Sequence, residues 1–255
     1  MKKALTTQQA MRYSRQILLA GFDLEKQEIL LNSRICLIGV GGLGCAASQY
    51  LVAAGIGKLT LIDDDIVELT NLQRQVLHFE RSVGVAKVDS ACSTLRQLNS
   101  DVELCKITAR QTEKQLTSIL GKHDIVIDCS DNLLTRNLLN RVCYAKQTPL
   151  ISGAAIRMEG QIFCMQPSEK TACYACISQF FGEQELSCVE SGVMSPVVGI
   201  IGAMQALEAI KTLCSYGQPA LNKLLIFDGI ESRWETIKVK RNQNCQICSR
   251  PSIQG

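Results

Sequence analysis

Four glycines near the amino terminus have the spacing of a phosphate-binding turn. They directly follow an apolar run at positions 35–38. Because residues without a Cβ let the backbone turn sharply, a phosphate can approach the amides that open the next helix. A second predicted strand, 58–62, ends at Asp63, roughly where a ribose-binding acid follows such a turn. The pattern predicts a nucleotide site. The alternative is that the glycines only let a helix and a strand pack closely. The four residues are Gly39, Gly41, Gly42 and Gly44.

Three charged residues follow other predicted elements at the same edge of the sheet: Arg74, Lys87 and Asp131. Two cations there would neutralise a polyphosphate, and a carboxylate would hold Mg²⁺ between phosphate oxygens. Each alone is typical of a solvated surface, but together with Asp63 they favour ATP over NAD. An NAD-dependent oxidoreductase, which rests only on the glycine fingerprint, stays as an alternative. A nucleotide-binding scaffold without turnover is the third.

Two C-x-x-C pairs form the second constellation, Cys173 with Cys176 and Cys245 with Cys248. Four thiolates are the ligand set of a closed tetrahedral zinc site, which predicts a structural Zn²⁺. The pairs are far apart in the chain, so the fold must bring them together. A redox C-x-x-C and four unconnected core thiols are the competing interpretations.

Cys188 lies in a long segment without periodicity, outside either pair, where an exposed thiol is a candidate nucleophile. The sequence has only two histidines, His78 and His123, and neither is an evident partner for it. An ordinary loop cysteine is the equal alternative. Both histidines are predicted to be structural or solvated.

The elements that position these residues alternate between strand and helix from position 34 to 128. This alternation predicts an α/β fold with a doubly wound, mostly parallel sheet, whose carboxyl-terminal edge collects the residues above in one crevice. After position 149, short strands at 150–155 and 161–165 predict that the sheet continues antiparallel. The long apolar stretch 197–214 is broken by polar residues on one helical face, which favours a buried helix over a membrane span.

Composition excludes several classes of function. The formal net charge is +3 with both signs interspersed, which argues against a nucleic-acid surface. The first nine residues lack the apolar core of a secretory signal. Thirteen cysteines without such a signal predict core thiols rather than a disulfide framework. We therefore expect a soluble, cytoplasmic protein with no nucleic-acid or membrane partner.

Over nearly its full length the chain resembles the ThiF-type adenylyltransferases, the bacterial relatives of ubiquitin-activating enzymes. The matching segments are 12–16, 39–44, 71–75, 128–132, 152–160, 188–192 and the two C-x-x-C pairs. Within the family, 153–160 and the residues around Cys188 look like the molybdopterin branch. The stretch 225–229 with Trp234 looks more like the thiamine branch.

The resemblance implies one adenylation domain over 1–255, with amino-terminal helices at 1–32, a nucleotide-binding half at 33–148 and a carrier-binding and zinc half at 149–255. It implies binding of ATP with Mg²⁺ and of the Gly-Gly tail of a small ubiquitin-like sulfur carrier. The tail carboxylate would attack the α-phosphate, release pyrophosphate and leave an acyl-adenylate. The carrier implied is the small subunit of molybdopterin synthase, with the thiamine-pathway carrier as the alternative.

The resemblance also assigns roles. Gly42 would contact phosphate, Asp63 the ribose, Arg74 and Lys87 the phosphates, and Asp131 the metal. Arg15 would reach the partner's site in a homodimer. Cys188 matches the position where some relatives form a thioester or persulfide link to the carrier, and sulfur would come from a separate donor protein. The full nucleotide-binding set implied is Gly39, Gly41, Gly42, Gly44, Asp63, Asp65, Asn71, Arg74, Gln75, Lys87, Asp131 and Asn132.

Overall fold

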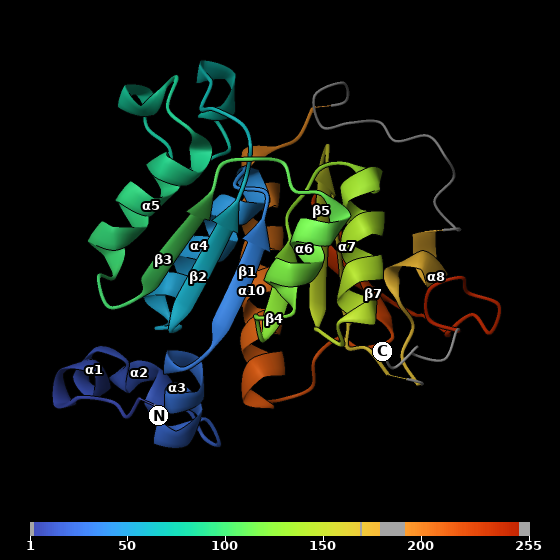
Figure 1. Ribbon diagram of the computed structural model, residues 1–255, viewed down its shortest axis with the longest axis horizontal. Helices are drawn as coiled ribbons and strands as arrows, with labels where there is room; N and C mark the ends of the chain where they lie inside the picture. Colours follow the sequence, from blue (N-terminus) through green and yellow to red (C-terminus); the bar gives the residue numbers. More distant parts are fainter. Residues whose placement is uncertain (1–2, 169, 179–191, 250–255) are drawn as a thin grey trace.

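The computed structural model describes residues 3–168, 170–178 and 192–249 (Figure 1). Its strands form one mixed sheet in the order β3-β2-β1-β4-β5-β6-β7-β8. The strands are β1 (Arg34–Ile38), β2 (Lys58–Ile62), β3 (Glu103–Ile107), β4 (Ile125–Asp128), β5 (Leu150–Ile156), β6 (Glu159–Met165), β7 (Lys223–Asp228) and β8 (Arg233–Lys238).

The first five strands are parallel and the last three run antiparallel, which confirms the predicted doubly wound sheet and its antiparallel continuation. The strand order reverses direction between β1 and β4. In open α/β sheets ligands bind at such a switch point, beyond the carboxyl ends of the strands.

Helices cover both faces of the sheet (Figure 1). One apolar core lies under α4, α5 and α10, and the other lies under α6, α7 and α8. The helices are α1 (Thr7–Arg12), α2 (Ser14–Ile17), α3 (Asp23–Leu31), α4 (Gly42–Ala53), α5 (Lys87–Leu98), α6 (Glu113–Leu120), α7 (Leu133–Ala145), α8 (Tyr174–Ser178) and α10 (Ser195–Cys214), with 3₁₀ turns η1 (Leu69–Asn71) and η2 (Glu80–Ser82).

Helix α7 is not among the elements expected from the sequence. Asn132 caps it, because its side-chain Oδ1 accepts a hydrogen bond from the Thr135 amide at 2.9 Å. Leu139 and Val142 on its inner face are buried in the core below the sheet. The helix therefore fills the crossover between β4 and β5 and carries residues of the pocket described below.

The amino-terminal helices lie beyond the amino ends of the strands, at the edge opposite the switch point (Figure 1). The end of α3 contacts the start of β2, where the Lys58 amide donates to the Ser33 carbonyl at 2.9 Å. Tyr13 lies between α1 and α2. Its side chain is buried, and its hydroxyl accepts a hydrogen bond from Asn99 Nδ2 at 2.9 Å.

Among the described residues one helix, α10, is long and apolar enough to cross a membrane by length and composition. Its polar residues Gln205 and Glu208 are 0% and 2% exposed and point into the fold. Gln205 Nε2 donates to the Asp128 carbonyl at 2.7 Å, which joins α10 to the end of β4. This is the pattern of a core helix.

Two glycines of the turn after β1 are required by close packing. Gly39 has φ +89°, in the left-handed region, and an added Cβ would lie 2.7 Å from the Cys129 carbonyl oxygen. A Cβ on Gly44 would lie 1.9 Å from the Gly39 carbonyl oxygen. Both neighbours are backbone carbonyl oxygens, so neither can move away without displacing the main chain at the turn.

Gly44→Ala is therefore expected to destabilise the protein by about 3 kcal/mol, in the upper range of overpacking mutations, because the new methyl meets backbone and not a flexible side chain. The urea midpoint of unfolding measures the effect. Gly199→Ala is the matched control, since Gly199 lies inside α10 and a methyl added there would have no atom within 4 Å. There the same change should stabilise by about 0.5 to 1 kcal/mol. Equal effects at both sites would contradict the packing argument.

Candidate functional site

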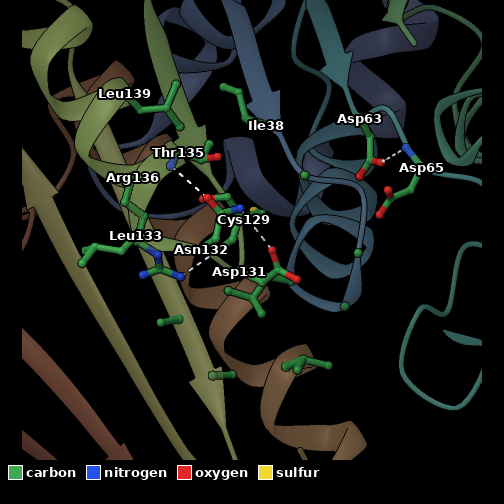
Figure 2. Close-up of a pocket in the computed structure, with 18 of the residues that line it drawn as sticks. Ile38, Asp63, Asp65, Cys129, Asp131, Asn132, Leu133, Thr135, Arg136 and Leu139 are labelled. Atoms are coloured by element: carbon green, nitrogen blue, oxygen red, sulfur yellow. Dashed lines mark hydrogen bonds between the residues drawn. The ribbon is translucent and has the colours of Figure 1, made fainter. Parts of the chain in front are cut away.

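A cavity of about 990 Å³ opens at the carboxyl ends of β1, β2 and β4. Figure 2 shows it between the Asp63–Asp65 segment after β2 and the segment from Asp131 to Arg136 after β4. The structure brings most of the expected nucleotide-binding residues into its lining. These are Gly39, Gly41, Gly42, Asp63, Asp65, Asn71, Arg74, Gln75, Lys87, Asp131 and Asn132.

The glycine turn lines the cavity, and a hydrogen bond to Asp63 holds it in place. The Val40 amide donates to Asp63 Oδ2 at 2.6 Å, which links the ends of β1 and β2. Gly41 is the N-cap of α4, so the amides of the first helical turn face the cavity as a ready anion site. Gly44 is not among the lining residues: it is buried in the first turn of α4 and packs on the Gly39 carbonyl.

Asp63 and Lys87 set the electrostatics on the β2 side. Burial is the main cause that raises the pKa of Asp63, while the amides of Val40 and Asp65 and the Lys87 charge lower it in part. Lys87 Nζ donates to Asp65 Oδ2 at 2.8 Å, and the Lys87 side chain is only 9% exposed against 68% for Asp65. The ammonium group is thus held at the cavity wall by an exposed carboxylate that can release it to a ligand.

The loop after β2 supplies a second cation, Arg74, and the side-chain amides of Asn71 and Gln75. Arg74 is half-buried, and its guanidinium donates to the Thr70 carbonyl at 3.1 Å. Asn71 closes the η1 turn by accepting from the Glu68 amide at 3.2 Å. Gln75 is 3% exposed, and its Oε1 has no hydrogen-bond partner among the described residues. A buried acceptor without a donor fits a site that a ligand completes.

A buried network supports Asp131 on the β4 side. The carboxylate of Asp128 is fully buried and accepts from Ser130 Oγ at 2.6 Å and from Ser152 Oγ at 2.8 Å. This holds the turn that follows β4, so that the exposed carboxylate of Asp131 projects at the cavity mouth (Figure 2). Asp131 is the carboxylate on this side that could hold a divalent cation.

Arg136 is a cavity residue that sequence reasoning missed. It lines the cavity, is 7% exposed, and donates from its guanidinium to the Ser130 carbonyl at 2.6 Å (Figure 2). It lies on α7, the helix that was not expected. The only signal in the sequence was its place four residues after Asn132, one helical turn into the helix that Asn132 caps.

The structure places Arg15 away from the cavity. Arg15 is exposed on α2, at the amino edge of the sheet, at least the length of a five-residue strand, about 16 Å, from the cavity edge. Cys188 lies outside the described residues. Both histidines are partly or fully buried and hydrogen-bonded, so neither is solvated.

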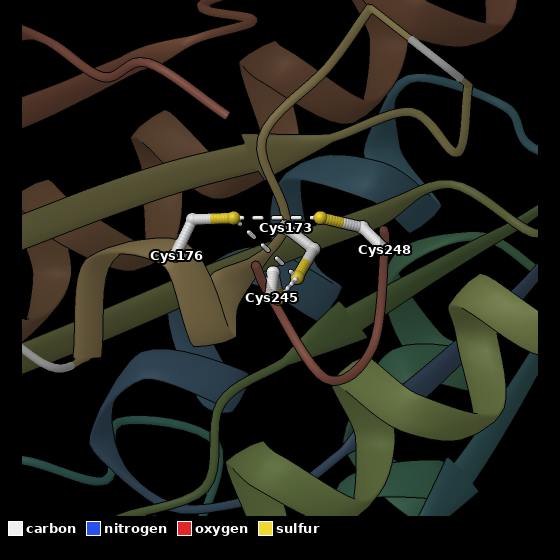
Figure 3. A group of neighbouring side chains, drawn as sticks. All are labelled: Cys173, Cys176, Cys245 and Cys248. Carbon is white, nitrogen blue, oxygen red and sulfur yellow. Dashed lines mark hydrogen bonds between the residues drawn. The ribbon is translucent and has the colours of Figure 1, made fainter. Parts of the chain in front are cut away.

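The four cysteines of the C-x-x-C pairs meet in the apolar core that α6, α7 and α8 cover (Figure 3). Each is at most 5% exposed. The Sγ atoms are 4.0 Å apart for Cys173 and Cys176, 3.6 Å for Cys173 and Cys245, and 3.4 Å for Cys176 and Cys248. Tetrahedral zinc with bonds of about 2.3 Å places its sulfurs about 3.8 Å apart. The distances also exclude S–S bonds.

The surroundings of the tetrad suit thiolates. Asn140 Nδ2 donates to Cys173 Sγ at 3.6 Å, and the Asn242 amide donates to Cys176 Sγ at 3.5 Å. Such donors stabilise negative sulfur and orient metal ligands. The donor set, burial and spacing therefore fit a metal ion, and the unconnected-thiol and redox interpretations do not explain why four sulfurs converge.

The sequence matches the model of the ThiF family over residues 13–247. The chain belongs to this family. Its relatives include molybdopterin-synthase adenylyltransferase of Escherichia coli strain K12, 48% identical over 96% of this chain and 99% of the relative. The sulfur carrier protein ThiS adenylyltransferase of the same strain is 42% identical over 93% of this chain and 94% of the relative.

Solved structures in the same superfamily agree with the fold. Escherichia coli MccB, solved with ATP, superposes with a TM-score of 0.82 at 27% identity, covering 93% of this chain and 74% of MccB. The ThiF-family relatives named above are adenylyltransferases, and so is this chain. The NAD-dependent oxidoreductase alternative is therefore set aside.

Proposed function

We propose that this protein uses ATP to adenylate the C-terminal glycine of a small ubiquitin-like sulfur carrier. The observation that carries the proposal is the convergence of Asp63, Arg74, Lys87 and Asp131 around the glycine turn in one cavity. Attack of a carboxylate on an anionic phosphorus needs cations that neutralise the developing charge, whereas hydride transfer does not call for a carboxylate placed to hold Mg²⁺.

The roles follow from position. The amides after Gly41 and the cations Arg74 and Lys87 would hold the phosphates, and Asp63 at the end of β2 would accept from the ribose hydroxyls. Asp131 would hold Mg²⁺, which neutralises charge on the phosphate oxygens when bound. Lys87 exchanges Asp65 for phosphate on ATP binding, because the exposed carboxylate is the weaker partner.

The carrier proposed is the small subunit of molybdopterin synthase, which is supported by the 48% identity to the Escherichia coli molybdopterin-synthase adenylyltransferase. The thiamine-pathway carrier is the second candidate, supported by the 42% identity to the ThiS adenylyltransferase. On this proposal residues 33–148 bind the nucleotide, residues 149–255 bind the carrier and zinc, and a separate protein donates sulfur. None of the described cysteines is in a disulfide, which fits a reducing cytoplasm.

We further propose a homodimer in which Arg15 completes the partner's site. The cations that line the cavity from one chain are Arg74, Lys87, Arg110, Arg136 and Arg157, and the Arg136 guanidinium donates to the Ser130 carbonyl. Arg15 is exposed at the opposite edge of the sheet, away from this cavity of its own chain. On this proposal a second copy brings its Arg15 to the cavity.

For the cysteine tetrad we propose one structural Zn²⁺. A closed shell of four sulfurs has no open position for water or substrate, so the ion would bind the 173–176 segment to the 245–248 segment and take no part in the reaction.

Carrier-dependent exchange of labelled pyrophosphate into ATP tests the proposed function. Both carriers are offered in parallel, and the molybdopterin-type carrier is expected to give the faster exchange. Arg74→Ala and Asp131→Ala should each lower the rate by about 100-fold or more, as loss of a group that stabilises transition-state charge does.

Arg81→Ala is the matched control for Arg74→Ala, because Arg81 is an exposed arginine of the same crossover that stacks on Phe79, outside the cavity lining. Its exchange rate should equal that of the wild type. Exchange without any carrier, no exchange with either Gly-Gly carrier, or equal rates in the two arginine variants would reject the proposal.

Mixing two inactive variants tests the shared site. Homodimers of Arg15→Ala and of Asp131→Ala should each lack exchange. In the mixed dimer the site with an intact Asp131 receives the intact Arg15 of the other subunit, so one of its two sites is whole. Random mixing should therefore restore about one quarter of the wild-type rate, because half of the dimers are mixed. If Arg15 acts within its own chain, the mixture stays inactive.

Metal analysis and thermal unfolding test the zinc site. We expect about one zinc per chain, lost in the double variant Cys245→Ser with Cys248→Ser. A metal that binds only the folded state stabilises it, so a loss of about 4 kcal/mol should lower Tm by about 10 °C. Cys105→Ser, a half-buried thiol on β3, is the control and should leave zinc content and Tm unchanged. An unchanged Tm in the double variant would contradict the assignment.

A further inference from the structure

His78 is a buried histidine that the reaction described above does not use. It lies between the Arg74 loop and α5 and is 4% exposed. Its Nε2 is 3.1 Å from the Val40 carbonyl oxygen, and its Nδ1 is 2.9 Å from Ser90 Oγ. The imidazole therefore touches the glycine turn on one side and α5 on the other.

These two partners determine the tautomer. A carbonyl oxygen can only accept, so Nε2 carries the proton and donates to Val40. Burial is the main cause that lowers the pKa of His78; the hydrogen bond to Val40 raises it in part and the Lys87 charge lowers it, so the net shift favours the neutral ring. Nδ1 is then a lone-pair acceptor, and the Ser90 hydroxyl donates to it.

The Val40 carbonyl belongs to the same peptide plane as the Gly41 N–H. In a trans peptide the carbonyl and the N–H point in opposite directions, so holding the carbonyl against His78 directs the Gly41 N–H away from the core. That side is the cavity, which Gly41 lines. No hydrogen bond among the described residues uses the Gly41 N–H.

The peptide plane between residues 40 and 41 rotates through ψ of Val40 and φ of Gly41, and a glycine accepts almost any φ. The amide of Val40 is fixed, because it donates to Asp63 at 2.6 Å. The Val40 carbonyl oxygen has two contacts, the His78 ring at 3.1 Å and the weaker donor Cys45 Sγ at 3.6 Å. His78 therefore supplies the stronger restraint on this carbonyl.

We propose that His78 is a positioning residue that locks the Val40–Gly41 peptide so that the Gly41 N–H faces the nucleotide phosphates. The ring also connects this turn to α5, because Ser90 lies one helical turn after Lys87. His78 itself belongs to the loop that carries Arg74, where its backbone amide donates to the Gln75 carbonyl at 3.0 Å.

The inference rests on the proposed binding of ATP, but its test needs no carrier. Calorimetric titration of the full-length protein with ATP and Mg²⁺ measures the dissociation constant for wild type and variants. If wild type binds ATP without carrier-dependent exchange, the proposed function fails and the role of His78 is still decided.

His78→Leu keeps the volume and removes both hydrogen bonds. It should weaken ATP binding about tenfold, the effect of losing one well-directed hydrogen bond to a charged group. In the exchange assay KM for ATP should rise by the same factor with kcat changed less than about threefold, since the phosphates are held alike in ground and transition states.

His78→Gln offers its side-chain Nε2 where the histidine Nε2 lies, so it should bring ATP affinity back to within about threefold of wild type. The matched control is His123→Leu. His123 is also enclosed, with Nε2 2.9 Å from Thr60 Oγ1 and Nδ1 2.9 Å from the Ile119 carbonyl, away from the cavity lining. This variant should lose stability and keep ATP affinity.

The inference is overturned if His78→Leu binds ATP as wild type does, if glutamine does not restore binding, or if His123→Leu weakens ATP equally. Should His78→Leu fail to fold, the ¹⁵N spectrum of histidine-labelled wild-type protein decides the question. A protonated Nε2 with a bare Nδ1 supports the lock, and a protonated Nδ1 refutes it.

Discussion

The hydrogen bond between the Val40 amide and the Asp63 carboxylate is the contact on which the site depends. At 2.6 Å it joins the ends of β1 and β2, beside the point where the strand order reverses between β1 and β4. The Asp63 carboxylate accepts this hydrogen bond and so holds the turn, and burial raises the pKa of Asp63. Asp63 therefore shapes the glycine turn from below and presents its remaining oxygen lone pairs to the cavity. Because one residue does both, strand register and ligand position are set together.

The elements that could be predicted from the sequence are those whose signals are local. The unbroken apolar run before Gly39 and the strand ending at Asp63 identify parallel strands buried on both faces, and their carboxyl ends must share an edge. Arg74, Lys87 and Asp131 then fall at that edge by topology alone. The hairpin of β5 and β6 and the helix beginning at Lys87 follow in the same way from short-range patterns.

What sequence reasoning missed depends on contacts distant along the chain. Helix α7 is the exception, because Asn132 is a capping residue and the buried positions that follow it recur at helical spacing, so its signal was local and Arg136 was missed with it. Gly44 has the spacing of a nucleotide contact, yet its role is packing, which only the approach of the Gly39 carbonyl reveals. No sequence motif marks His78, and the role proposed for it depends on its hydrogen bond to Val40, which follows β1.

The cysteine tetrad also has a consequence for the order in which the chain assembles. Neither C-x-x-C pair supplies more than two sulfurs, and α10, β7 and β8 all lie between the pairs in the sequence. An ion that needs four sulfurs can reach its full affinity only after these elements have folded back onto β6, since closing so long a loop carries a large entropy cost beforehand. Metal binding would then come late in folding. In a chain without metal the sheet would be formed, but the 245–248 segment would not be held against the 173–176 segment.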